Sequence, residues 1–131
     1  MKIMNPRDEK MLAYAALCQQ QTYSFIRTMI MEMPFFNRRE FVQTQLERLT
    51  RYVTSLNARY DPAWPEDVRL RMIASLDAFN KRSEAVREVL SRPGELTLWD
   101  ACGAIGDIGI AYGNLWSAKI CANAEQVRLV D

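Results

Sequence analysis

The chain has 131 residues, of which 49% are hydrophobic and 25% are charged. This length suits one domain with a sizeable core, and the composition excludes a disordered chain. Seventeen Lys and Arg residues against 16 Asp and Glu give a formal net charge of +1. The basic excess typical of nucleic-acid-binding domains is therefore missing, and nucleic acid is disfavoured as a partner.

Histidine is absent from the sequence, and cysteine occurs three times. Without histidine, Ser–His and Cys–His pairs, His-containing zinc sites and Glu-x-x-His di-iron sites cannot form. Cys18, Cys102 and Cys121 are odd in number and lack CxxC spacing, so we interpret them as reduced thiols of a cytoplasmic protein. We therefore expect no catalytic residues, no metal and no cofactor.

The first ten residues, MKIMNPRDEK, contain no apolar run of the kind that forms a signal peptide. No later stretch is both long and free of charge, as a membrane-spanning helix would be. The sequence therefore predicts a cytoplasmic protein that does not insert into a membrane.

Helix-starting signals mark the first half of the chain. Asn5 followed by Pro6 matches an N-cap and a first helical position. Asn37 with Glu40 three residues later matches a capping box. Pro34 lies between these signals and separates the first helix from the second.

The second half of the chain carries similar signals. Pro65 predicts the start of a third helix, and residues 92–94 (Arg-Pro-Gly) predict its end. Thr97 with Asp100 predicts a capping box for a fourth helix, after which residues 123–131 form a fraying tail. The predicted helices span about residues 6–32, 38–60, 65–91 and 98–122.

Apolar side chains recur with gaps of 4, 3, 4, 3 and 4 residues along the second and third helices. This spacing is typical of packed helical seams. Together with the short turns, it predicts an all-α, up-down-up-down four-helix bundle, with residues 1–131 as a single helical-bundle domain. The two seams are Val42, Leu46, Leu49, Val53, Leu56 and Tyr60, then Met72, Leu76, Phe79, Ser83, Val86 and Leu90.

The fourth helix contains four glycines, each of which costs a helix about 1 kcal/mol relative to alanine. At about 100° per residue they cluster on one broad face, which also carries Trp99 and Ile110. A face of small residues lets another backbone approach closely. The backbone could belong to the same bundle or to an outside partner, or the helix could be broken here. The glycines are Gly103, Gly106, Gly109 and Gly113.

Asp100, Asp107 and Asn114 of the fourth helix repeat every seven residues and form one narrow polar stripe on a helix that is otherwise apolar nearly all round. This polar stripe matches a solvated edge or salt bridges to arginines of a neighbouring helix. A paired-carboxylate site is the functional alternative. Because a helix that is apolar nearly all round is usually buried, we expect contacts beyond a simple bundle.

The first turn contains Met33, Phe35 and Phe36. These side chains either cap the core or form an adaptable binding surface. In the predicted topology they share one end of the bundle with residues 92–94.

The predicted function is non-catalytic protein binding through helix faces, as in a small regulator, inhibitor or adaptor of a bacterium or phage, with a homodimer as the expected state. The alternatives are a carboxylate-dependent all-α hydrolase, using Glu84, Glu88 or Asp77 with Asp100 or Asp107, and, with less support, a nucleic-acid-binding protein. The candidate interface residues are Trp99, Gly103, Gly106, Gly109, Ile110, Gly113, Trp116, Met33, Phe35 and Phe36.

Overall fold

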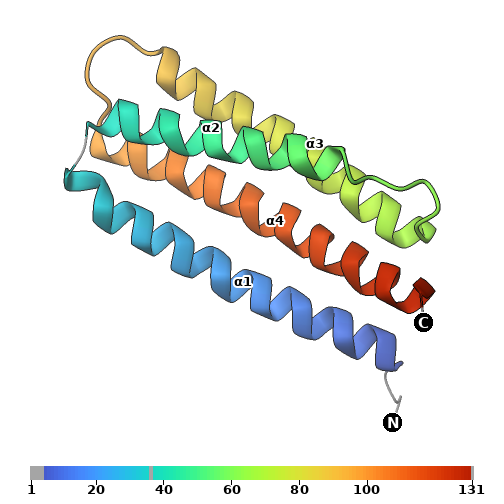
Figure 1. The fold of residues 1–131 in the computed structure, drawn as a ribbon. Coiled ribbons are helices and arrows are strands. Elements are labelled where there is room, and N and C mark those ends of the chain that lie inside the picture. The colour runs from blue at the N-terminus through green and yellow to red at the C-terminus, as the bar shows by residue number, and fades with distance from the viewer. Residues whose placement is uncertain (1–4, 36, 131) are drawn as a thin grey trace.

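A computed structural model describes residues 5–35 and 37–130, with the side chains of residues 7, 35, 121 and 123–130 outside the described part. The chain forms the predicted all-α four-helix bundle, and the start of the first helix and the end of the last lie at the same end (Figure 1). The elements are α1 (Pro6–Glu32), the 3₁₀ turn η1 (Met33–Phe35), α2 (Arg38–Asn57), α3 (Glu66–Ser91) and α4 (Leu98–Val130).

Two helix boundaries differ from the predicted ones. Helix α2 ends at Asn57, because the backbone N–H groups of Arg59 and Tyr60 donate to the carbonyls three residues earlier. Tyr60 therefore leaves the α2 seam, and its ring packs edge-on against Trp64 at a centroid distance of 5.7 Å. Helix α4 continues to Val130, whereas the predicted fraying of residues 123–131 stays a prediction.

Both predicted capping boxes place their cap residue as expected. The Asn37 side chain accepts a hydrogen bond of 3.1 Å from the backbone N–H of Glu40, at the start of α2. Thr97 Oγ1 accepts a 3.1 Å bond from the N–H of Asp100, at the start of α4. Each bond satisfies a backbone donor that the first turn of a helix leaves unpaired, which is why these two helices begin where they do.

Helix α4 is the central element of the bundle. It lies between α1 on one side and the pair α2 and α3 on the other (Figure 1). Within the described residues, no Cα of α1 lies within 8 Å of a Cα of α2 or α3. Among the other three long helices, α1 therefore packs its backbone closely on α4 alone.

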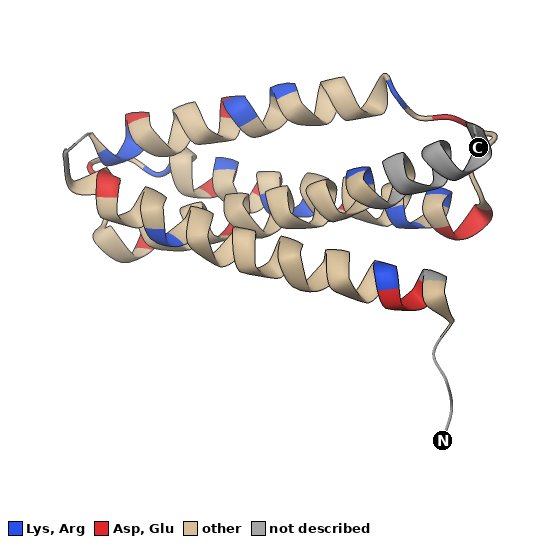
Figure 2. Cartoon of the chain, turned by 60° about the horizontal axis from the view of Figure 1, so that its bottom comes forward, with Lys and Arg blue, Asp and Glu red and all other residues tan. Residues whose placement is uncertain are grey.

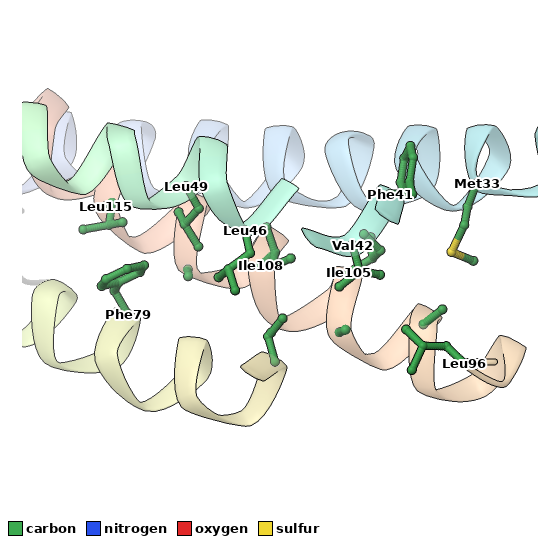
Figure 3. Packing of buried hydrophobic residues seen from close by; sticks show 14 of the residues in the cluster. Met33, Phe41, Val42, Leu46, Leu49, Phe79, Leu96, Ile105, Ile108 and Leu115 are labelled. Carbon is green, nitrogen blue, oxygen red and sulfur yellow. The ribbon is translucent and has the colours of Figure 1, made fainter. Parts of the chain in front are cut away.

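The main hydrophobic core explains why α4 is apolar on so many sides. Ile105, Ile108 and Leu115 of α4 are buried against side chains of α2 and α3 (Figure 3). A second cluster joins Trp64 and α3 to the later part of α4. Much of the apolar surface that the sequence left without a partner is thus covered inside the bundle. The main-core residues labelled in Figure 3 are Met33, Phe41, Val42, Leu46, Leu49, Phe79, Leu96, Ile105, Ile108 and Leu115.

The start of α2 holds the loop between α3 and α4. The Arg39 guanidinium donates to the carbonyl of Leu90, and also to those of Arg92 at 2.7 Å and Gly94 at 2.6 Å. Arg38 donates to the carbonyl of Leu96 at 3.1 Å. These bonds satisfy carbonyls in the last turn of α3 and in the loop beyond it, and they bring the first and third turns to the same end, as predicted.

None of the helices in the described part combines the length and the apolarity that crossing a membrane requires.

Candidate functional site

The glycine face of α4 divides into two halves, and its later half is internal packing. A methyl group built on Gly109 would overlap the side chain of Ile26, and one built on Gly113 would overlap Thr22. Both neighbours lie on α1. The absent side chains let α1 approach α4 closely, so these two glycines are part of the bundle itself.

The earlier half of the glycine face is open. Methyl groups built on Gly103 and Gly106 would meet no described atom within 4 Å outside their own helical neighbourhood. Trp99 is 86% exposed and Ile110 is 38% exposed. Successive gaps of 4, 3 and 4 residues separate Trp99, Gly103, Gly106 and Ile110. These four residues therefore lie along one side of the helix. We call Trp99, Gly103, Gly106 and Ile110 the open strip.

The positions of α1 and α3 explain why the open strip is uncovered. Asp107 of α4 faces α3, and Gly113 faces α1. At 100° per residue, the open strip falls between these two directions. Since α1 and α3 do not approach each other there, neither helix covers the strip. Ser117, which follows in the same row, is buried, so the strip is open only along the first part of α4.

The polar stripe of α4 makes contacts with arginines and α3. Asp107 Oδ1 lies 2.8 Å from Arg82 Nη1, and Asp100 Oδ2 lies 3.2 Å from Arg92 Nη1. The backbone carbonyl of Asn114 accepts a 3.2 Å bond from Ser75 Oγ of α3. The predicted salt bridge to an arginine of a neighbouring helix is therefore confirmed for Asp107, whereas the arginine that pairs with Asp100 lies just beyond the end of α3.

The carboxylates required by the hydrolase alternative do not form a metal-binding cluster in the described part of the chain, where no group of three or more His, Cys, Asp or Glu residues is placed to hold a metal ion. Asp77, Glu84 and Glu88 are exposed on α3. Segments with Lys or Arg and segments with Asp or Glu are interspersed among uncharged stretches of the helices (Figure 2). These positions supply no observation that favours catalysis or nucleic-acid binding.

The remaining candidate interface residues do not belong to the open strip. Met33 is fully buried in the main core, so its side chain cannot present a surface to an outside partner. The side chain of Phe35 and the whole of Phe36 lie outside the described residues. Trp116 is half-buried and lines a groove between α1 and α2, together with Gly109 and Gly113.

Sequence reasoning missed most of that groove. Arg48 and Tyr52 line it from α2, and Lys119 lines it from α4. The spacing of Arg48 and Tyr52, four residues apart on one helix face, could have drawn attention to them. Their meeting with α1 and α4 depends on how the helices pack.

Comparison with family models, curated proteins and solved structures gives no match to this chain. The function is therefore inferred from the residues of the chain alone.

Proposed function

We propose that this protein works by protein–protein binding through the open strip of α4, and that the partner in that contact is a second copy of the chain. The observation that carries the proposal is the nearly full exposure of Trp99 beside two glycines with empty space above them. An exposed tryptophan next to a shallow surface is typical of an interface anchor, because burial of its large apolar ring supplies much of the binding energy.

The open strip is complementary in shape to itself. Trp99 and Gly106 are seven residues apart, about 10 Å along the helix axis. If two α4 helices pack antiparallel about a two-fold axis between residues 102 and 103, each Trp99 lies opposite the Gly106 of the other copy. The Trp99 ring of each copy then fills the space above Gly106 of the other copy. The same contact therefore occurs twice, once on each side of the axis. Such reciprocal contacts are what a two-fold interface requires.

Gly103 supports the same arrangement, since it lies beside the proposed axis and allows two helix backbones to approach closely. The helix-propensity cost of Gly103 and Gly106, about 1 kcal/mol each, brings no packing gain inside the isolated bundle. Contact with a second helix would offset that cost. The proposal thus accounts for two glycines that the fold of one chain does not need.

Sedimentation equilibrium tests this proposal. We expect wild-type protein at micromolar concentration to sediment with twice the 15.2 kDa mass of the chain. Trp99→Ala removes the anchor and Gly106→Leu fills the space opposite it, so each should weaken the dimer by at least about 10-fold. Tyr23→Ala, which removes an exposed aromatic ring from α1, is the matched control and should leave the mass unchanged.

A wild-type protein that stays monomeric throughout the concentration range would overturn the proposal. Equal weakening by Trp99→Ala and Tyr23→Ala would also overturn it, because the contact would then not be specific to α4. Circular dichroism of each variant checks that the helices are retained.

A further inference from the structure

A groove of about 450 Å³ lies between α1 and α2, above α4. Its volume falls in the range of small-molecule binding sites. The groove exists because α1 packs its backbone on α4 without approaching α2, so the space between α1 and α2 is not filled. It shares no lining residue with the open strip. The lining residues are Gln21, Thr22, Phe25, Met29, Gln45, Arg48, Tyr52, Gly109, Tyr112, Gly113, Trp116 and Lys119.

Aromatic rings from three helices line this groove. The centroids of Phe25 and Tyr112 are 5.2 Å apart with an interplanar angle of 53°. Those of Tyr52 and Tyr112 are 5.5 Å apart with an angle of 41°. Trp116 lies in the same lining. Rings at such tilts present both faces and edges, which suit contact with a planar aromatic body.

The charged side chains that line the groove are all positive. Arg48 and Lys119 line it, and none of its lining residues is acidic. In the described chain, neither cation lies within ion-pair distance of a carboxylate. Lys119 Nζ lies over the Tyr52 ring, 5.7 Å from its centroid, so this ammonium group is next to an aromatic ring of the lining.

Positive charges also act on the ring of Tyr112, which lines the groove. Burial raises the pKa of Tyr112, and the positive charges of Arg48 and Arg51 partly offset this shift by lowering the pKa. An anion placed in the groove would therefore find two cations and no opposing carboxylate in the lining. The combination of apolar rings and unpaired cations is complementary to a ligand with an aromatic body and an acidic group.

Tyr52, which lines the groove, carries a buried hydroxyl group without a hydrogen-bond partner in the described part of the chain. Tyr52 Oη is inaccessible to solvent and forms no hydrogen bond with any described group. A buried polar group without a partner destabilises the fold. Gln45, 5% exposed, supplies a further buried polar side chain in the lining.

We propose that the groove between α1 and α2 is a binding site for a small anionic aromatic molecule. Its aromatic body lies against Phe25, Tyr112 and Trp116, and its acidic group lies between Arg48 and Lys119. The proposal does not depend on dimer formation, because the open strip contributes no residue to this site.

A pair of fluorescent probes tests both parts of the proposal. The anion 8-anilinonaphthalene-1-sulfonate and the neutral N-phenyl-1-naphthylamine share the same aromatic skeleton and differ by the sulfonate group. We expect one anionic probe to bind per chain, at least about 10-fold more tightly than the neutral probe at low salt. Charge-assisted contacts to the sulfonate supply this difference.

Substitutions locate the binding. Arg48→Gln and Lys119→Gln should each weaken binding of the anionic probe by about 10-fold and leave binding of the neutral probe unchanged. Lys81→Gln, an exposed cation on α3 outside the lining, is the matched control and should change neither affinity. Trp99→Ala should also change neither, which separates this site from the proposed dimer contact.

Equal affinity for the two probes would overturn the assignment of an anionic ligand. Probe binding that persists unchanged in the double variant Arg48→Gln/Lys119→Gln would overturn the assignment of the site itself. Retention of the wild-type unfolding midpoint in each variant excludes a loss of binding through unfolding.

Discussion

The two halves of the glycine face on α4 contain two glycines each, but their surroundings differ. Gly109 and Gly113 lie against Ile26 and Thr22 of α1, whereas Gly103 has open space above it. In the later half, the missing side chains create the contact between two helices of one bundle. In the earlier half, they leave a shallow surface beside an exposed tryptophan. A glycine face on a helix therefore has no single meaning, and the neighbouring element decides its role.

The largest expected effect comes from filling the packed half. Gly113→Leu places a side chain where Thr22 lies, so we expect a loss of about 3 kcal/mol in the free energy of unfolding. Urea denaturation followed by circular dichroism measures this loss. Gly103→Leu, on the same helix but in the open half, is the matched control. Losses of equal size in the two variants would show that the halves do not differ as described.

Alkaline pH tests the burial of Tyr52, which lines the groove from α2. Burial is the main cause that raises the pKa of Tyr52 from 10.0 to about 12, and Tyr112 and Cys18 add to it. In the unfolded chain this tyrosine loses its proton near pH 10, so the unfolded state binds fewer protons between pH 10 and 12. The stability associated with Tyr52 is thus complete below pH 10 and decreases as the pH rises through this window, by about 2 kcal/mol.

The measurement is the free energy of unfolding of wild type and Tyr52→Phe from pH 9 to pH 12. The variant should lose less stability than wild type over this range, because it lacks the titrating hydroxyl. Tyr23→Phe serves as the control for an exposed tyrosine and should follow wild type. Parallel curves for wild type and Tyr52→Phe would contradict the raised pKa.

The smallest expected effect is a gain, not a loss, in the free energy of unfolding. Gly103→Ala and Gly106→Ala place methyl groups in open space, so each should raise the free energy of unfolding of the monomer by about 1 kcal/mol through helix propensity. Urea denaturation at a concentration below dimer formation measures the gain. The same alanines should weaken self-association, because they occupy the proposed contact. A loss of monomer stability in either variant would mean that the open half is covered.

Local sequence signals predicted the helix starts well. Asn37 and Thr97 accept hydrogen bonds within their own first turns, so four consecutive residues contain all the information needed. The end of α2 was less predictable, because Tyr60 continues the apolar spacing of the seam. Its ring packs instead on Trp64, a contact that the periodicity of one helix does not include.

The site residues were predictable only as a set. The open strip contains Trp99, Gly103, Gly106 and Ile110, which helical spacing had grouped on one face together with the two packed glycines. The packed half of the glycine face could be distinguished from the open half only once the position of α1 was known. The groove was even harder to predict from the sequence, because Arg48, Phe25 and Lys119 come from three different helices.

By itself, the sequence determined four helices, the starts of α2 and α4, and an α4 that has both a glycine face and a polar stripe. These features follow from caps, breakers and apolar spacing, which act over a few residues. Only the tertiary structure decided that α4 lies at the centre, that Arg39 holds carbonyls more than 50 residues away, and that Met33 is buried. It also decided which glycines contact α1. Such outcomes depend on packing between distant segments, because a side chain is buried only where another element approaches it.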